Sequence, residues 1–386
     1  MMDHIYFDHN ATTQLDSLVL EAMLPWMQHQ SGNPTSRHYF GRAARDAVEH
    51  ARSQVAQACG AYPAQIVFTS SGTEANNFAM KGMANHVPQG QILTSAIEHP
   101  CVTAPAVTMK NLGFTHDVIP VNAQGKIDTE VFKDLLKTST SVASIMLANN
   151  ETGVIQEIAD LAEIARKTGA LFHTDAVQMF GKLPVSFTDL NVHAMTISSH
   201  KIHGPQGAAA LVLDKRVDIT PLMHGGGQEK GLRSGTENVA AIIGFGTACT
   251  LAVERLKNSA QKIRALREQF ELGLRKIQHH LNVTIFSDQV TRIPNTSFFA
   301  INNIEGETLV TALDKQGFAV ASGSACSSDS TEPSHVLLAM GVHHDLARGA
   351  VRVSFGANNT AEEVAKFLAV LEQEVLRLKQ LTAIAA

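Results

Sequence analysis

The chain reads Ser198-Ser199-His200-Lys201-Ile202-His203-Gly204-Pro205-Gln206-Gly207 directly after a short apolar run, residues 194–197. The apolar run predicts a buried strand, and the glycines and the proline after Lys201 predict a turn. Packing in an apolar core is a poor explanation for Lys201, because its neighbours in the sequence are two serine hydroxyls and two histidine imidazoles. Desolvation and neighbouring cations would lower the pKa of the Lys201 amine and make it nucleophilic, and such amines form Schiff bases with carbonyl compounds. An ordinary surface lysine at a strand end is the alternative that this stretch leaves open.

Strands and helices alternate on either side of this stretch. Apolar runs predict strands near residues 65–69, 91–94, 115–121, 141–148, 170–173, 194–197 and 208–213. The alternation predicts an α/β fold with a mainly parallel sheet, whose ligands bind outside the carboxyl ends of the strands. Polar residues gather at those ends, and we expect them to share one crevice: Thr73, Asn150, Asp175, Gln178, Ser198, His200 and Lys201.

One of these strand ends has the features of a phosphate site. The turn Ser70-Ser71-Gly72-Thr73 precedes a predicted helix, residues 74–86. Thr73 is a natural N-cap, Gly72 lets the backbone approach a ligand closely, and the free amides of a helix start attract an anion. A plain capped helix is the alternative interpretation.

The composition is that of an ordinary globular enzyme. The 386 residues are 44% hydrophobic and 17% charged, and this length favours about two domains. The formal charge of −5 and the lack of lysine or arginine runs argue against nucleic-acid binding. Neither a signal peptide nor a bilayer-spanning helix is expected. The four cysteines lack CxxC spacing, so we expect a cytoplasmic protein in a reducing compartment.

A long helical stretch, residues 237–278, is apolar at first and charged later, and we place a domain boundary inside it near Asn258. The remainder predicts a smaller α+β unit with strands near residues 283–286, 297–301, 319–322 and 351–355. Its last helix begins at Thr360 with Glu363 three residues on, which is a capping box. The predicted domains are a large α/β domain and a small α+β domain, comprising residues 15–258 and residues 1–14 with 259–386.

Seven motifs taken together resemble the cysteine desulfurases, which are pyridoxal phosphate (PLP)-dependent enzymes of aminotransferase class V. They match in type and in order and span nearly the whole chain: Asp8-His9-Asn10-Ala11-Thr12-Thr13, Gly32-Asn33-Pro34-Thr35-Ser36, Ser71-Gly72-Thr73-Glu74, Asn149-Asn150-Glu151-Thr152-Gly153, His173-Thr174-Asp175-Ala176-Val177-Gln178, Ser199-His200-Lys201 and Ser322-Gly323-Ser324-Ala325-Cys326-Ser327. The resemblance is to the branch that serves nitrogenase maturation and iron–sulfur cluster assembly. It implies the PLP-dependent transferase fold (aminotransferase fold type I), with a seven-stranded sheet and a homodimer as the active form.

Two departures from the family pattern stand out. Ser199 occupies a position that is often glycine, which would alter the turn and leave the ligands in place. The chain stops at Ala386, whereas the cluster-assembly enzymes carry a longer tail that helps to dock the scaffold protein.

The resemblance implies a role for most of the polar residues. Lys201 would hold PLP and take the Cα proton of the substrate, Asp175 would pair with the pyridinium nitrogen, and Gln178 would donate to the ring oxygen. The phosphate would lie among Gly72, Thr73, Ser198 and His200, with Thr236 reaching it from the other subunit. The substrate carboxylate would meet Asn150 and Arg352, with Asn33 as a weaker candidate.

His99 would stack on the cofactor ring and move protons for a thiol, although a histidine before a proline is more often a turn residue. His200 and His203 have a spacing that suits a metal, but no third ligand is evident, so no metal is expected.

Cys326 would receive the sulfur. It lies among small polar residues, Ser322 to Asp329, which is the composition of a mobile loop. A mobile thiolate could attack the substrate sulfur and carry it outward as a persulfide. Cys59 and Cys249 are interpreted as core thiols. Cys101 is the rival nucleophile, because it follows His99 closely and a helix N-terminus would lower its pKa.

The expected function is conversion of L-cysteine to L-alanine, with the sulfur retained on the enzyme and passed to an acceptor or scaffold protein. That sulfur would serve iron–sulfur clusters, other sulfur-containing cofactors or thionucleosides. Two other classes stay open: a different PLP reaction, such as selenocysteine lysis or transamination, and a non-catalytic protein that binds sulfur carriers.

Overall fold

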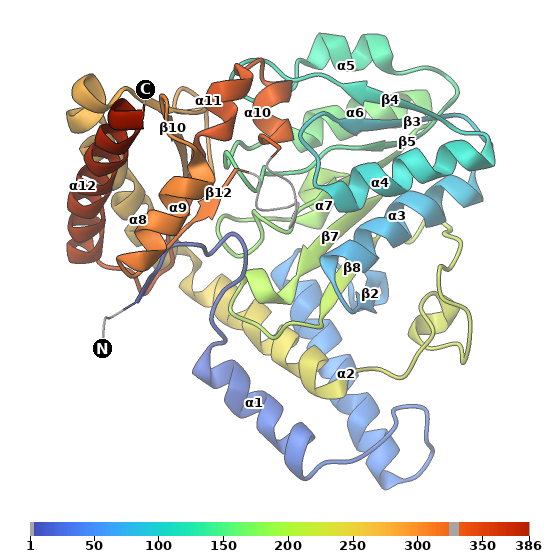
Figure 1. The fold of residues 1–386 in the computed structure, drawn as a ribbon. Coiled ribbons are helices and arrows are strands. Elements are labelled where there is room, and N and C mark those ends of the chain that lie inside the picture. Colours follow the sequence, from blue (N-terminus) through green and yellow to red (C-terminus); the bar gives the residue numbers. More distant parts are fainter. Residues whose placement is uncertain (1–3, 324–331, 386) are drawn as a thin grey trace.

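The computed structural model describes residues 4–323 and 332–385, and a seven-stranded sheet forms its centre (Figure 1). In spatial order its strands are β2 (Ile66–Thr69), β8 (Ala209–Leu213), β7 (Ala194–Ser198), β6 (Leu171–Asp175), β5 (Thr140–Ser144), β3 (Gln91–Ser95) and β4 (Thr115–Ile119). β8 runs antiparallel to both of its neighbours, and the other pairs are parallel. The prediction of a mainly parallel, seven-stranded sheet is confirmed.

Helices cover both faces of this sheet, and the alternation of side chains explains why. Neighbouring residues of one strand enter different cores: Val67 and Ile92 pack with α3, whereas Phe68 and Leu93 pack in the core on the opposite face. The helices of this part of the chain are α1 (Ser17–Gln28), α2 (Tyr39–Ala58), α3 (Gly72–His86), α4 (Pro100–Met109), α5 (Thr129–Leu135), α6 (Ile158–Thr168) and α7 (Phe187–Leu190). Short 3-10 turns are η1 (Pro63–Gln65), η2 (Lys110–Leu112), η3 (Ser199–Lys201) and η4 (Glu229–Gly231).

A smaller antiparallel sheet lies beside the large one, in the order β12 (Ala321–Ser322), β13 (Ala350–Ser354), β10 (Thr296–Ile301) and β9 (Val283–Ile285). The N-terminal strand β1 (Ile5–Tyr6) pairs with β11 (Phe318–Ala319), which attaches the N-terminal segment to the C-terminal part of the chain. A core of phenylalanines, among them Phe7, Phe270 and Phe367, packs this sheet against α9 (Gly306–Lys315) and α12 (Ala361–Ala385). Two short helices complete this part, α10 (His335–Ala339) and α11 (His344–Arg348).

The capping box predicted for the last helix is present. Glu363 N–H donates to Thr360 Oγ1, and Thr360 N–H donates to Glu363 Oε2. The strand predicted at residues 319–322 is instead two short strands, β11 and β12, which pair in different sheets.

α8 (Val239–Leu281) runs from α2 beneath the large sheet to α12 on the small one (Figure 1). Phe245 of this helix is buried in the large core and Phe270 in the small one. By length and composition alone, α8 is apolar enough to cross a membrane, so the expectation that no stretch would meet that criterion was wrong. The boundary near Asn258 stays a prediction.

Candidate active site

A cavity of about 370 Å³ opens at the carboxyl ends of β6 and β7. It brings together most of the predicted site residues: Gly72, Thr73, His99, Asn150, Asp175, Gln178, Ser198, His200, Lys201 and Arg352. All of these residues except Arg352 end or follow strands of the large sheet, and the parallel strands deliver them to one edge of the sheet. Asn10, Ser71, Asn76 and Cys101 also line the cavity.

Two predicted residues stand apart from this group. Among the residues that the structure describes, Asn33 and Thr236 are not part of the cavity lining. Asn33 is exposed, and its side chain accepts hydrogen bonds from Thr35. Thr236 is exposed on the loop before α8. Cys326 lies outside the described residues.

Lys201 ends the 3-10 turn η3, which immediately follows β7. Gly204 permits this turn, because a Cβ there would lie 2.1 Å from Ser199 Oγ. Lys201 Nζ donates to the carbonyl oxygens of Asn10 at 2.5 Å and Ala11 at 2.6 Å. The N-terminal segment therefore crosses the cavity mouth and positions the amine.

Asp175 ends β6 and is 6% exposed. Its Oδ2 accepts from Asn76 Nδ2 at 2.6 Å, and its Oδ1 accepts from the Val177 N–H at 2.9 Å. Both carboxylate oxygens thus have a donor that fixes their direction. The sequence reasoning missed Asn76, although it lies one helical turn after Gly72 on α3 and therefore on the same face.

The helix start next to this carboxylate differs from the prediction. α3 begins at Gly72, and its N-cap is Ser71, whose hydroxyl accepts from the Glu74 N–H at 3.1 Å. The assignment of Thr73 as the N-cap was wrong, because a Ser-x-x-Glu pattern places the cap at the serine. Ser198 Oγ is buried, borders the same cavity and has no hydrogen-bond partner among the described residues. An orphaned hydroxyl of this kind is expected where a ligand completes the site.

His99 and Cys101 form a pair at the start of α4. His99 is the N-cap, and its Nδ1 accepts the Cys101 N–H at 3.2 Å, which leaves the ring proton on Nε2 when the ring is neutral. Burial lowers the pKa of His99; the Asp175 carboxylate opposes this effect, and the charges of Lys201 and His335 add to it. Cys101 Sγ lies 2.9 Å from His99 Nδ1 and 3.0 Å from Asn76 Nδ2.

The prediction that the pKa of Cys101 is lowered was wrong. Burial, and then the Asp175 carboxylate, raise the pKa of the Cys101 thiol to about 12. These effects outweigh the helix N-terminus, so Cys101 is a neutral thiol at physiological pH and a poor nucleophile. Cys59 and Cys249 are buried, as predicted for core thiols.

Arg352 reaches the cavity from β13 of the small sheet. Its Nη2 donates to Asp8 Oδ1 at 2.7 Å and its Nη1 to the Asn150 carbonyl oxygen at 3.1 Å. Its Nε has no hydrogen-bond partner among the described residues. The guanidinium is therefore held in place by protein groups while donors remain for an anion.

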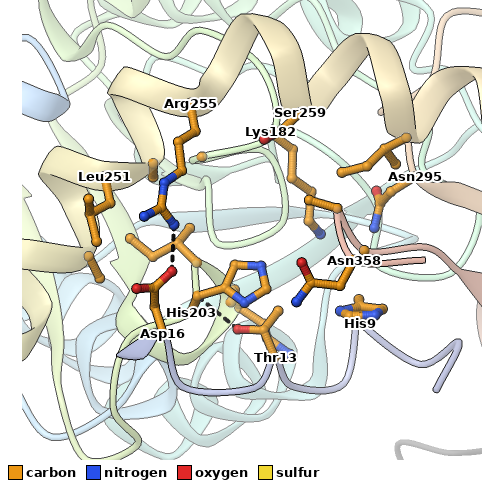
Figure 2. A pocket seen from close by; sticks show the side chains of 18 of the residues that line it. His9, Thr13, Asp16, Lys182, His203, Leu251, Arg255, Ser259, Asn295 and Asn358 are labelled. Carbon is orange, nitrogen blue, oxygen red and sulfur yellow. Dashed lines mark hydrogen bonds and ion pairs between the residues drawn. The ribbon is translucent and has the colours of Figure 1, made fainter. Parts of the chain in front are cut away.

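A second cavity of about 120 Å³ lies beneath α8 (Figure 2), and Lys201 lines this cavity as well. Arg255 reaches from α8 to Asp16, and the His203 N–H donates to Thr13 Oγ1. Lys182 and His9 also line this space. Burial, with His203 and Lys182 nearby, lowers the pKa of His9 to about 4, so this histidine is neutral at physiological pH.

Comparisons with known proteins identify the protein family to which this chain belongs. The model of the family described as aminotransferase class V matches residues 5–367. The chain belongs to this PLP-dependent family, and within it to the cysteine desulfurases. It is 42% identical to the cysteine desulfurase IscS of Dictyoglomus turgidum over 99% of this chain and 97% of that one.

Solved structures agree with this assignment. A NifS-like protein superimposes with a TM-score of 0.91 at 38% identity, covering 97% of this chain and all of that one. A structure described as SspA in complex with cysteine superimposes with a TM-score of 0.80 at 32% identity, covering 92% and 99% of the two chains.

The residues of the first cavity fit PLP. The orphaned Ser198 hydroxyl lies beside the N-terminus of α3, where backbone N–H groups and a helix dipole favour a phosphate. The Asp175 carboxylate, aimed by Asn76 and Val177, suits a protonated ring nitrogen. Lys201 lines the same cavity and supplies the amine that a carbonyl cofactor needs.

Proposed function

We propose that this chain converts L-cysteine to L-alanine and keeps the sulfur as a persulfide on Cys326, for delivery to an acceptor in iron–sulfur cluster assembly. The observation that carries the proposal is the single cavity that contains the Lys201 amine, the Asp175 carboxylate and the His99 imidazole. When bound, PLP supplies an electron sink that makes bonds at the substrate carbon atoms labile.

Lys201 would hold the cofactor and then move the substrate Cα proton at Nζ. Asp175 would hold the ring nitrogen, and its two fixed hydrogen bonds support this role because they prevent the carboxylate from turning away. Arg352 and Asn150 would orient the substrate carboxylate. His99 would orient the substrate thiol through Nε2–H, because Nδ1 is engaged by the start of α4.

The described residues on either side of the segment that carries Cys326 support its role as sulfur acceptor. A Cβ at Gly323 would lie 3.3 Å from Ser334 Cβ, so the two ends of the segment lie together. Ser334 donates to the buried Glu151, and His335 Nε2 lies 3.0 Å from the carbonyl oxygen of Glu98, the residue before His99. The described residues that follow the segment therefore contact the loop that carries His99 into the cavity.

The sulfur transfer balances without an added oxidant. The Cys326 thiolate attacks the substrate sulfur, an S–S bond forms, and the C–S bond breaks with its electron pair staying on the substrate carbon. That carbon gains a proton and becomes the methyl group of alanine, while Cys326 becomes a persulfide.

We further propose a homodimer and a protein sulfur acceptor. Thr236 is exposed and does not line the cofactor cavity of its own chain. Such a position suits a residue that contacts the PLP phosphate bound in the other subunit. Apolar side chains are also exposed on α1 and at the start of α2: Leu18, Leu20, Leu24, Met27, Tyr39 and Phe40. Exposed apolar side chains that gather on one part of a surface favour a protein contact.

The test is a product assay with the purified protein. Loaded with PLP, it should show a visible absorption band and form alanine from L-cysteine, and Lys201→Ala should stop turnover. A keto acid as the product, or native turnover by Lys201→Ala, would contradict the proposal. Alanine formed from selenocysteine alone would favour a selenocysteine lyase.

A further inference from the structure

Lys182 is a lysine near the cofactor cavity to which no role has been given. It follows Gly181, whose φ is +76° and which packs so closely that a Cβ would lie 2.4 Å from Ile202 Cγ2. Because Ile202 is the residue after Lys201, this contact brings the segment after Asp175 back beneath the catalytic lysine.

The Lys182 ammonium has no carboxylate partner in the described part of the chain. Burial, and then the charges of Lys201 and Arg352, lower its pKa well below the usual range of a lysine. The side chain is half-buried, and an ammonium group that is partly removed from water without a counter-ion needs hydrogen-bond acceptors.

That contact is with two side-chain amides. Lys182 Nζ donates to Gln178 Oε1 at 2.8 Å and to Asn10 Oδ1 at 2.9 Å. Asn10 Oδ1 has a second donor, Asn295 Nδ2 at 2.8 Å. For Gln178 Oε1, the described residues offer Lys182 alone as a donor.

The consequence is a fixed direction for the Gln178 amide. A protonated lysine only donates hydrogen bonds, so while Lys182 is charged the end of the amide that faces it is the oxygen, as the structure shows. The NH₂ end then lies on the opposite side, where Nε2 donates to the Asn10 carbonyl oxygen at 3.0 Å, and both Gln178 and Asn10 line the cofactor cavity. A flipped amide would place its N–H groups against the ammonium group.

We propose that Lys182 is a positioning residue that holds the donor end of Gln178 toward the cofactor. Figure 2 shows Lys182 on the wall of the second cavity, so it acts from behind the site. This inference rests on the proposed function in one respect, namely that Gln178 donates to bound PLP.

The experiment is a double-mutant cycle on the full-length enzyme. Lys182→Met, Gln178→Ala and the double variant are dialysed against graded PLP, and the pH midpoint of the visible band is recorded for each. Lys182→Met removes the donor and keeps most of the apolar stem. Lys215→Met, at an exposed lysine in the turn after β8, is the matched control.

Gln178→Ala and Lys182→Met should each weaken PLP binding about tenfold and should shift the pH midpoint in the same direction. The double variant should be no worse than Gln178→Ala, because Lys182 acts through Gln178. Lys215→Met should match the native enzyme. Should Lys182→Met fail to fold, Lys182→Gln takes its place in the same cycle.

The inference is overturned if Lys182→Met keeps the native PLP affinity and the native pH midpoint while Gln178→Ala loses them. It is also overturned if the loss of affinity in the double variant is the product of the two single losses. Native PLP binding by Gln178→Ala would instead refute the role of Gln178 in the proposed function, and this inference with it. The first two outcomes leave the proposed function intact, so the two failures are distinguishable.

Discussion

Asn76 Nδ2 donates a hydrogen bond to Asp175 Oδ2 across 2.6 Å, and it is the side-chain donor that aims this carboxylate. Asn76→Ala should therefore weaken PLP binding about 10- to 100-fold, because a hydrogen bond to a charged group contributes about 1.5–3 kcal/mol. Asn77→Ala is the matched control, since Asn77 donates to backbone oxygens. Dialysis against a series of PLP concentrations measures the PLP affinity of both variants. Equal affinities of Asn76→Ala and Asn77→Ala would contradict the role of Asn76.

Ser198 tests the phosphate site. Its buried hydroxyl lacks a partner among the described residues and borders the cavity. Ser198→Ala should weaken binding of PLP about tenfold and leave binding of pyridoxal, which has no phosphate, within about twofold of native. Ser199→Ala is the control, because its hydroxyl is also buried without a described partner but lies beside Gly204 and outside the cavity lining. If both cofactor forms lose affinity equally, the phosphate lies elsewhere.

Glu98 should make stability depend on pH. Burial raises the pKa of Glu98 from 4.5 to about 8 in the folded protein. Between these values the folded protein keeps a proton that the unfolded chain releases. The contribution of Glu98 is therefore fully present below about pH 4.5 and is lost as the pH rises to about 8, by up to roughly 1.4 kcal/mol for each pH unit.

Glu98→Gln removes this proton and keeps an oxygen that accepts from Ser95 Oγ and the Met146 N–H. The free energy of unfolding in urea, measured from pH 5 to 9, should fall more steeply in the native protein than in the variant. Parallel curves would show that Glu98 titrates normally.

Thr236 tests whether the site is shared between two chains. A heterodimer of Thr236→Ala with Lys201→Ala contains one site with a native Lys201 and a native Thr236 from the partner. Activity should reappear on mixing, provided that Thr236→Ala alone is impaired. No recovery in confirmed heterodimers would argue that each site is built within one chain.

The fold was predictable because its signals are local. Apolar runs and the turns after them located the strands of the large sheet, and the carboxyl ends of parallel strands must share one edge. That rule is why Thr73, Asp175 and Lys201, far apart in sequence, could be expected in one cavity.

The parts that sequence reasoning missed depend on packing. A helix N-terminus lowers the pKa of a nearby thiol, but burial outweighs this effect at Cys101. The predicted direction of its pKa shift was therefore wrong. Asn10 acts through contacts with Lys182 and Lys201, which are distant in the sequence and cannot be predicted from motif spacing. Asn76 could have been found, because it shares a helix face with Gly72. The roles of Asn33 and Cys326, the domain limits and a cytoplasmic location stay predictions.

The central claim is tested most directly by counting sulfur on the protein after exposure to L-cysteine. Mass spectrometry of the native enzyme should show one added sulfur on the peptide that contains Cys326, lost on reduction, with alanine formed alongside it. In Cys326→Ala, PLP should still bind and alanine formation should collapse, because the covalent route is removed. An added sulfur on Cys101, with Cys326→Ala fully active, would contradict the account.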